Sequence, residues 1–214
     1  MEIIVNNLCK SIAGATVLHN MNYTFSGGKI YGLRGKNGCG KTMLMRSIAG
    51  LMKPTSGEIY INEEMLYSDL DVPKSIGILI ENPAFLTEYS GFNNLKLLAG
   101  IKKKINENQI MTILEKVGLD YKDKRPVRKY SLGMKQRLGI AAAIMEEPDI
   151  ILLDEPINAI DEEGVESIKQ CIFELKADNR IIIVACHDRE ELDSLADVVL
   201  KLSNGTIVGE ETVC

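Results

Sequence analysis

The residues most able to do chemistry lie in one glycine-rich segment, Gly35–Thr42, which has the pattern G-x-x-x-x-G-K-T. An apolar segment that predicts a strand, Lys29–Leu33, precedes it, and a run typical of a helix, Met43–Met52, follows it. Glycine lets the backbone bring its N–H groups close to a polyphosphate, and the helix start adds a positive dipole end. This pattern predicts a phosphate-binding loop, in which Lys41 reaches the β- and γ-phosphates and Thr42 ligates Mg²⁺. The residues of this segment and the one after it that are expected to contact the nucleotide are Gly35, Lys36, Asn37, Gly38, Cys39, Gly40, Lys41, Thr42 and Met43.

A pair of acids is the second candidate for chemistry. Asp154 and Glu155 come directly after a continuous apolar run, Ile150–Leu153, which predicts a buried strand. Unpaired carboxylates at the edge of a core are costly, so a cation partner is expected. Beside a phosphate-binding loop, the pair is a candidate for holding a metal ion and activating water.

Composition narrows the class of protein. The chain has 214 residues, which suits one domain, and its net charge of −5 argues against a general nucleic-acid binder. No apolar stretch approaches the roughly 18 residues of a membrane span. The chain starts with a strand-like segment, Glu2–Val5, so we expect no signal peptide. The five cysteines lack C-x-x-C spacing, which is typical of reduced cytosolic thiols.

Further segments complete a series of motifs that resembles a known family. Tyr130–Arg137 is similar to the LSGGQ signature of the ATP-binding subunits of ABC (ATP-binding cassette) transporters, with Leu132 for the first glycine and Met134 for the glutamine. Asn158–Asp161 resembles the D-loop of that family, and His187, after an apolar run, resembles its switch histidine. The phosphate loop and the acid pair correspond to its Walker A and Walker B motifs, which implies that Asp154 holds Mg²⁺, directly or through water, and that Glu155 polarises the attacking water. The resemblance spans essentially the whole chain.

The resemblance implies the fold. We expect an α/β protein with a P-loop NTPase core, in which a mixed, mainly parallel sheet is flanked by helices. An antiparallel β-subdomain and an inserted helical subdomain complete this single ABC ATPase domain of residues 1–214. The expected bounds are 1–30 and 57–63 for the β-subdomain, 31–56, 74–81 and 146–214 for the core, and 82–145 for the helical subdomain.

The signature implies a second subunit. Ser131 and Gly133 keep a hydroxyl and a glycine amide at a helix N-terminus, where N–H groups bind anions. In the family this site holds the γ-phosphate bound to the phosphate loop of the other subunit. The resemblance therefore implies a head-to-tail dimer, homo- or heterodimeric, that sandwiches two ATP. It also implies that Asp161 contacts the other subunit, besides capping the helix that follows, and that His187 contacts the γ-phosphate as a catalytic residue.

Two positions near the nucleotide depart from the family pattern. Ile12 stands where the family carries an aromatic residue that stacks on adenine, and Val17 is expected at the nucleotide with it. Glu81 follows the apolar run Ser75–Ile80 and replaces a glutamine that contacts Mg²⁺ and the attacking water. We expect Glu81 to bind the metal and take part in catalysis. The alternatives are that Ile12 only packs the small sheet and that Glu81 is a solvated loop acid.

The run Ile78–Pro83 resembles the subgroup that exports peptide antibiotics or gives immunity to them. We therefore expect a MgATP-hydrolysing subunit, peripheral on the cytoplasmic face of the cell membrane. It would drive export of a peptide, antibiotic or other amphiphile through separate integral-membrane permease subunits, without binding nucleic acid. The alternatives are a soluble ABC ATPase that acts on nucleic acid or ribosomes, and a regulatory nucleotide-binding subunit with little turnover.

Overall fold

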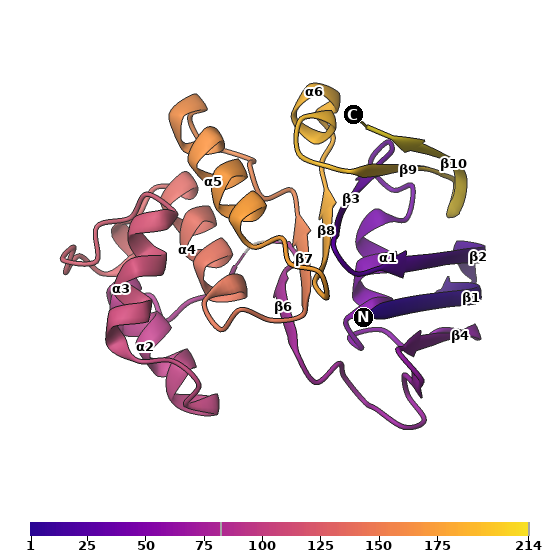
Figure 1. Cartoon of the computed structure of the whole chain (residues 1–214), viewed down its shortest axis with the longest axis horizontal. Helices are drawn as coiled ribbons and strands as arrows, with labels where there is room; N and C mark the ends of the chain where they lie inside the picture. The colour runs from indigo at the N-terminus through magenta and orange to yellow at the C-terminus, as the bar shows by residue number, and fades with distance from the viewer. Residues whose placement is uncertain (82, 214) are drawn as a thin grey trace.

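A six-stranded sheet with the order β10-β9-β3-β8-β7-β6 runs through the middle of the molecule (Figure 1). The computed structural model describes residues 1–81 and 83–213, so Asn82 of the Ile78–Pro83 run lies outside the described residues. Neighbouring strands pair in parallel except β9 and β10, which are antiparallel. The strands of this sheet are β3 (Lys29–Arg34), β6 (Ile76–Leu79), β7 (Ile150–Asp154), β8 (Ile181–Ala185), β9 (Val198–Ser203) and β10 (Thr206–Thr212).

Each central strand contributes side chains to two cores, because successive residues point to opposite faces of a sheet. On β7, Ile151 and Leu153 belong to the core under the helical layer, whereas Ile150 and Leu152 belong to the core on the other face. All of β7 and β8 is buried, which explains their continuous apolar sequences.

A second, four-stranded antiparallel sheet with the order β2-β1-β4-β5 lies on one side of the central sheet, together with α1 (Figure 1). Its strands are β1 (Glu2–Ile12), β2 (Ala15–Ser26), β4 (Ser56–Ile61) and β5 (Glu64–Met65). The first two strands are longer than their apolar segments predict. A tight turn at Ala13 and Gly14, with φ angles of 48° and 83°, joins them into a long hairpin whose outer part is exposed.

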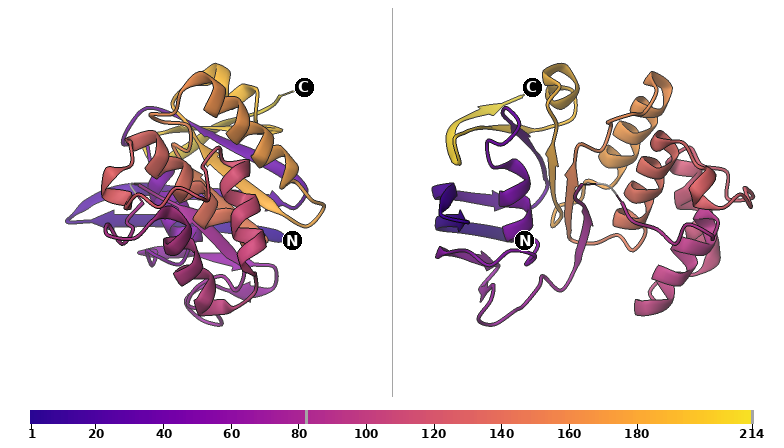
Figure 2. Two further views of the ribbon diagram at one scale, coloured as in Figure 1. Left: turned by 90° about the vertical axis from the view of Figure 1, so that its left-hand side faces the viewer. Right: turned by 180° about the vertical axis from the view of Figure 1, so that it is seen from behind.

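The other face of the central sheet carries a layer of helices (Figures 1 and 2). The described residues form these helices, on both faces of the sheet: α1 (Lys41–Ile48), α2 (Gly91–Lys102), α3 (Glu107–Lys116), η1 (Val127–Lys129, a 3₁₀ turn), α4 (Leu132–Ile144), α5 (Glu162–Glu174) and α6 (Arg189–Asp193). Helices α2 to α5 make up this layer, in which α2 and α3 lie farthest from the small sheet. Helix α1 ends before the expected Met52 because Gly50 takes a left-handed conformation, with φ 75°.

These observations confirm the expected P-loop NTPase fold with its antiparallel sheet and helical layer. The residue bounds of the three parts stay predictions. The parallel order of β3, β8 and β7 has one consequence for chemistry. The carboxyl ends of these neighbouring strands lie along one edge of the sheet, where open α/β sheets bind ligands. They lead directly into the glycine-rich loop, the Asp154–Glu155 pair and the Cys186–His187 segment.

Candidate active site

The glycine-rich loop joins β3 to the N-terminus of α1. Gly38 and Gly40 have φ angles of 78° and 110°, which side-chain-bearing residues rarely adopt, and Gly40 occupies the N-cap of the helix. Lys41 is buried, with 6% of its surface exposed, and its Nζ donates a hydrogen bond to the Gly35 carbonyl at 2.7 Å. The loop therefore aims the first N–H groups of α1 and one ammonium group at a shared space, which is an anion-binding arrangement.

The two residues predicted to hold Mg²⁺ lie in direct contact. The Thr42 hydroxyl donates a hydrogen bond of 2.6 Å to Oδ2 of Asp154, which joins the start of α1 to the end of β7. Burial raises the pKa of Asp154, and the nearby charges of Glu155 and Glu81 add to this effect, while the Thr42 hydrogen bond opposes it. Oxygen donors with excess negative charge suit a hard cation, so this donor set fits Mg²⁺.

Asp154→Asn is expected to raise the melting temperature of the nucleotide-free protein. The raised pKa means that the ionised carboxylate is less favourable in the folded than in the unfolded chain, so this charge lowers stability above the acid range. Asn removes the charge and keeps an acceptor for Thr42. Each kcal/mol gained should raise the melting temperature by about 2–4 °C. The gain should be present at pH 7 and vanish below about pH 4, where Asp is protonated in both states. A thermal scan at both pH values checks this, and a lower melting temperature at pH 7 would contradict it.

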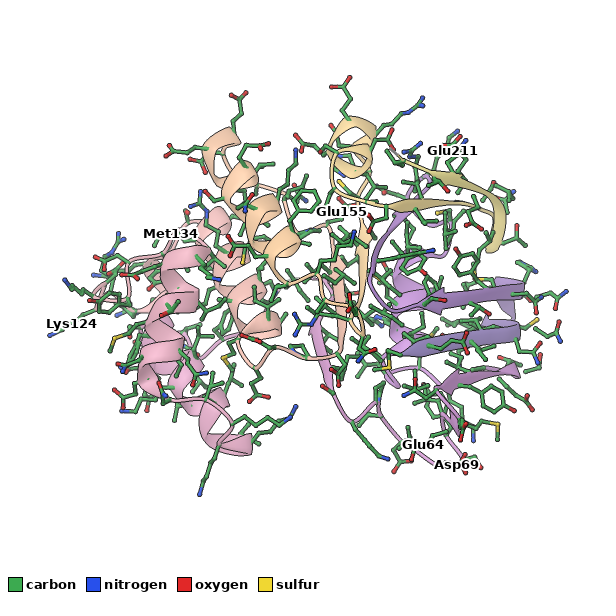
Figure 3. The ribbon with its side chains drawn as sticks, viewed as in Figure 1. Glu64, Asp69, Lys124, Met134, Glu155 and Glu211 are labelled. Carbon is green, nitrogen blue, oxygen red and sulfur yellow. The ribbon has the colours of Figure 1, made fainter. Side chains whose placement is uncertain are left out.

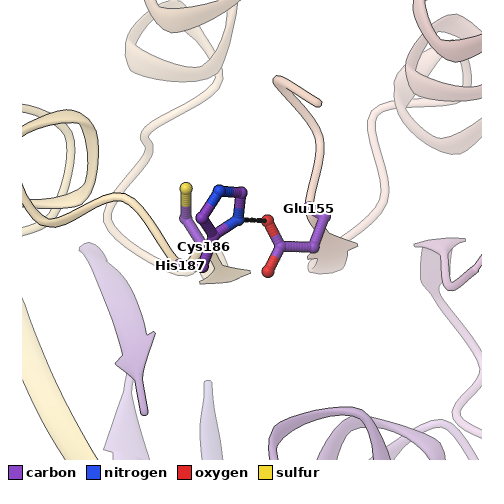
Figure 4. Close-up of side chains that lie close together, drawn as sticks. All are labelled: Glu155, Cys186 and His187. Atoms are coloured by element: carbon purple, nitrogen blue, oxygen red, sulfur yellow. Dashed lines mark hydrogen bonds and ion pairs between the residues drawn. The ribbon is translucent and has the colours of Figure 1, made fainter. Parts of the chain in front are cut away.

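Glu155 and His187 form the second contact at this edge. Oε2 of Glu155 lies 2.7 Å from Nδ1 of His187 (Figure 4). The His187 side chain is 65% exposed, whereas that of Glu155 is 27% exposed. A carboxylate held by an imidazole, open on one side to solvent, can accept a proton from a water molecule.

The backbone of Glu155 is held from both sides. Its φ of 48° is uncommon for a residue with a side chain, and such strain persists only where the surroundings enforce it. The Glu155 N–H donates to the Ala185 carbonyl at 2.8 Å, and Nε2 of Gln136 donates to the Glu155 carbonyl at 2.9 Å. Gln136 is buried in α4, so the signature helix positions the acid. The sequence carries no signal for this role, because Gln136 stands between Lys135 and Arg137 in the polar part of α4.

Gln136→Met is expected to lower kcat by about 3- to 10-fold, which corresponds to the loss of one hydrogen bond. Met has a similar length and keeps the packing but cannot donate to the Glu155 carbonyl. The KM for ATP should stay unchanged because Gln136 does not line the nucleotide cleft among the described residues. Steady-state kinetics with a thermal scan check this. A change confined to KM would show that Gln136 acts on binding instead.

One cleft of about 590 Å³ collects most of the predicted nucleotide site, and this volume is in the usual range for ligand sites. Ile12 and Val17 of the small sheet line it, and their place near the base stays a prediction. Asp154, Glu155 and Glu81 line it opposite the loop. The loop residues that line it are Asn37, Gly38, Cys39, Gly40, Lys41, Thr42 and Met43. Gly35 contributes the carbonyl that accepts from Lys41, and Lys36 is exposed beside the lining residues.

Glu81 both lines the nucleotide cleft and forms an ion pair outside it. It faces the cleft with Asp154, and it also forms an ion pair with Nη2 of Arg46 at 2.7 Å. Its φ of 62° places it in the left-handed region. The ion pair is solvent-exposed and therefore weak, so Glu81 is able to exchange Arg46 for another cation.

Of the signature, Leu132 reaches a pocket of about 280 Å³ beside this cleft, which it lines with Asp154 and Glu155, whereas Ser131 and Gly133 do not line the cleft within the described residues. Ser131 caps α4, where its hydroxyl accepts a hydrogen bond from the N–H of Met134 at 3.1 Å. In Figure 3, Met134 stands on the helical layer, whereas Glu155 stands at the central sheet. Within the described part of the chain, Asp161 does not line the nucleotide cleft either.

The capping role expected for Asp161 is wrong. Asp161 occupies the N-cap of α5, but within residues 1–81 and 83–213 its side chain makes no capping bond. The carboxylate pairs with the guanidinium of Arg137 on α4. This charged partner outcompetes the local N–H groups, and it ties the D-loop to the signature helix. Gly133 reinforces the contact, because a Cβ there would lie 2.6 Å from the Ala159 carbonyl of the same loop.

Comparison with known proteins agrees with this geometry. A family model described as ABC transporter matches residues 18–158. A Bacillus subtilis protein described as an uncharacterized ABC transporter ATP-binding protein is 48% identical, over 99% of this chain and 97% of its own length. The chain belongs to the ABC transporter family.

Two relatives carry names that describe a transported compound. A lantibiotic transport ATP-binding protein of Streptococcus pyogenes is 38% identical, over 97% of this chain and 89% of its own length. A bacitracin transport ATP-binding protein of Enterococcus faecalis is also 38% identical, over 100% of this chain and 70% of its own length.

The fold of this ABC ATPase also matches solved structures. An ATP-binding cassette solved as a dimer in a post-hydrolysis state, bound to ADP and Pi, has a TM-score of 0.87 and 23% identity, with 99% of each chain covered. This likeness shows the fold, and the family match together with the 48% identical relative identifies this protein as an ATP-binding, ATP-hydrolysing subunit of the ABC transporter family. In the described residues, no helix combines the length and the apolar character that crossing a membrane requires.

Proposed function

We propose that this ABC ATPase powers the export of a peptide antibiotic, or a similar amphiphile, through separate membrane subunits. The observation that carries the substrate class is the 38% identity, over nearly the whole chain, to two ATP-binding proteins named for lantibiotic and bacitracin transport. Glu81 and the run around it supported the same class from the sequence.

The proposed reaction is attack of water on the γ-phosphate of ATP. The loop N–H groups and Lys41 bind the phosphates, and the Lys41 ammonium turns from the Gly35 carbonyl toward them. Glu155 accepts hydrogen bonding from the attacking water and polarises it, while His187 holds the carboxylate through Nδ1 and contacts the γ-phosphate. The residues supply positioning and charge neutralisation, which account for most catalysis of phosphoryl transfer.

Thr42 and Asp154 would hold Mg²⁺, with Glu81 as a further oxygen donor. The ion would supply charge neutralisation on the phosphate oxygens. Asp154 would contribute most to the binding of Mg²⁺, because a buried carboxylate charge is costly without a cation beside it.

Glu81→Gln is expected to leave ATP hydrolysis within severalfold of wild type. The amide keeps one oxygen donor and removes one negative charge near the γ-phosphate, and these effects oppose each other. The Arg46 ion pair is lost in the same variant, so Arg46→Gln serves as the matched control. Hydrolysis rates over a Mg²⁺ titration check this. A complete loss in Glu81→Gln alone would show that the acid takes a direct part in the chemistry.

The active site is proposed to be completed by a second copy of this chain. Among the described residues, Ser131 and Gly133 do not line the nucleotide cleft of their own chain, and the start of α4 offers the Ser131 hydroxyl and its first N–H groups to an anion. A head-to-tail dimer would place these groups against the γ-phosphate of the partner. The link from Asp161 to Arg137 would then connect the D-loop at the dimer contact to the signature helix.

The proposed contact for the membrane subunits lies beside Glu81. A groove of about 290 Å³ there is lined by apolar residues and Arg46. Leu86 and Tyr89, which follow the groove in the chain, are about half exposed. An exposed apolar surface of this kind suits a protein partner. The chain would in this way be held at the cytoplasmic face of the cell membrane. The lining residues are Arg46, Leu51, Ile78, Leu79, Ile80, Pro83, Ala84, Phe85, Leu98, Gly139 and Ala142.

The export proposal predicts a resistance phenotype. A host strain lacking this chain should become more sensitive to a lantibiotic, to a bacitracin-type peptide or to both. Wild-type chain should restore resistance, whereas Glu155→Gln made at the same level should not. Growth-inhibition assays with a panel of peptide antibiotics measure this. Unchanged sensitivity to every member of the panel would contradict the proposed substrate class.

A further inference from the structure

A sulfur atom lies beside the residues that activate water. Cys186 follows β8 and is buried, and its neighbour in the chain is His187. One ligand atom each from Glu155, Cys186 and His187 fall within 4.8 Å of one another. Figure 4 shows the Cys186 sulfur alongside the imidazole ring, whose Nδ1 faces the Glu155 carboxylate.

These three donors are of the types that zinc binds. Zn²⁺ takes thiolate, imidazole and carboxylate ligands, and its bond lengths place tetrahedral ligand atoms about 3.5 Å apart. Glu155 and His187 already lie closer than this, at 2.7 Å. The imidazole is 65% exposed and follows β8 on a loop, so small adjustments of its ring are compatible with the metal–ligand distances. Solvent would supply the fourth ligand on this open side.

We propose that Glu155, Cys186 and His187 form an inhibitory site for Zn²⁺, distinct from the oxygen site for Mg²⁺ at Thr42 and Asp154. The inference rests on the proposed roles of Glu155 and His187, because a zinc ion would occupy the carboxylate and the imidazole that the reaction needs. Hydrolysis stops for that reason, while the phosphate loop stays free to bind ATP.

The chemistry of the sulfur separates the two metals. Cys186 is a buried thiol, and its sulfur becomes a metal ligand only when it loses its proton. A bound Zn²⁺ forms the metal–sulfur bond as the thiol releases this proton to solvent, and no electron is transferred. Mg²⁺ prefers oxygen ligands and binds sulfur poorly, so the site discriminates against it.

Cobalt spectroscopy tests the site without turnover. Co²⁺ added to the wild-type protein should produce a sulfur-to-cobalt charge-transfer band, and Zn²⁺ should displace it. Cys186→Ser should lose the band and bind Co²⁺ and Zn²⁺ at least about tenfold more weakly. Cys171→Ala is the matched control, because Cys171 is also buried, with its pKa raised to about 11, and lies outside this cluster. Its band should equal that of wild type.

An activity arm tests inhibition. With MgATP in large excess, Zn²⁺ should inhibit wild type and Cys171→Ala alike, whereas Cys186→Ser should keep its basal activity and need at least about tenfold more Zn²⁺ for the same inhibition. Equal bands and equal inhibition in wild type and Cys186→Ser would overturn the inference. Because the cobalt arm requires no hydrolysis, a band lost in Cys186→Ser would support the metal site even if Glu155 proved not to activate water.

Discussion

Glu155→Gln is expected to reduce ATP hydrolysis by about 10²- to 10⁴-fold, the range attributed to a positioned general base. The amide keeps the size of the side chain but cannot take a proton from water. It leaves the loop, Lys41 and the Thr42–Asp154 contact in place, so the affinity for MgATP should change little. The variant should therefore accumulate as an ATP-bound dimer.

Steady-state hydrolysis, ATP binding by equilibrium titration and size-exclusion chromatography in ATP measure these effects together. Glu163→Gln, an exposed acid in the first turn of α5, is the matched control and should behave like wild type. If Glu155→Gln kept more than about a tenth of wild-type turnover, a loss of only 1.4 kcal/mol, Glu155 would not be the base.

Lys41→Ala is expected to weaken ATP binding by about 10- to 150-fold, as estimated from about 1.5–3 kcal/mol for a charged hydrogen bond. Lys41 is buried at the helix start, so its ammonium contributes to a site already shielded from water. Hydrolysis should fall further than binding, because the charge on the phosphates grows in importance at the transition state.

Equilibrium binding of a fluorescent ATP analogue measures the first effect, and single-turnover hydrolysis at saturating ATP measures the second. Lys53→Ala, which removes an exposed lysine outside the cleft, is the matched control. Wild-type affinity in Lys41→Ala would contradict the assignment of this loop as the phosphate site.

From the sequence, the candidate active site could be predicted where a residue able to do chemistry directly follows a buried strand. The glycine loop, the acids after β7 and the histidine after β8 each follow an apolar run, and parallel strands bring such endings to one edge. The approach of Glu155 to His187 and of Thr42 to Asp154 could therefore be expected from the order of the motifs.

Contacts between distant segments were less accessible from the sequence. Asp161 was predicted to cap α5 because an acid before a helix favours capping. Its carboxylate instead forms an ion pair with Arg137 on another helix. The support of Glu155 by Gln136 depends in the same way on how α4 packs against the end of β7. The strand-like segment was expected over Glu2–Val5, but β1 continues to Ile12 because its outer part is exposed and lacks apolar alternation.

The central claim is that one chain cannot complete its own active site, and mixing two inactive variants tests it most directly. The first variant carries Lys41→Ala and Glu155→Gln, so its own phosphate loop and acid cannot support hydrolysis, whereas its signature is intact. The second carries Ser131→Asp, which keeps a good helix cap but places a negative charge against the γ-phosphate. In a head-to-tail dimer of the two, the loop of the second variant meets the intact signature of the first.

Each variant alone should hydrolyse almost no ATP. An equal mixture should recover about a quarter of wild-type activity, because about half of the dimers are mixed and each mixed dimer has one complete site of two. Hydrolysis by the Ser131→Asp variant alone would show that each chain acts by itself, and a mixture that never exceeds the average of the separate variants would also contradict the composite site.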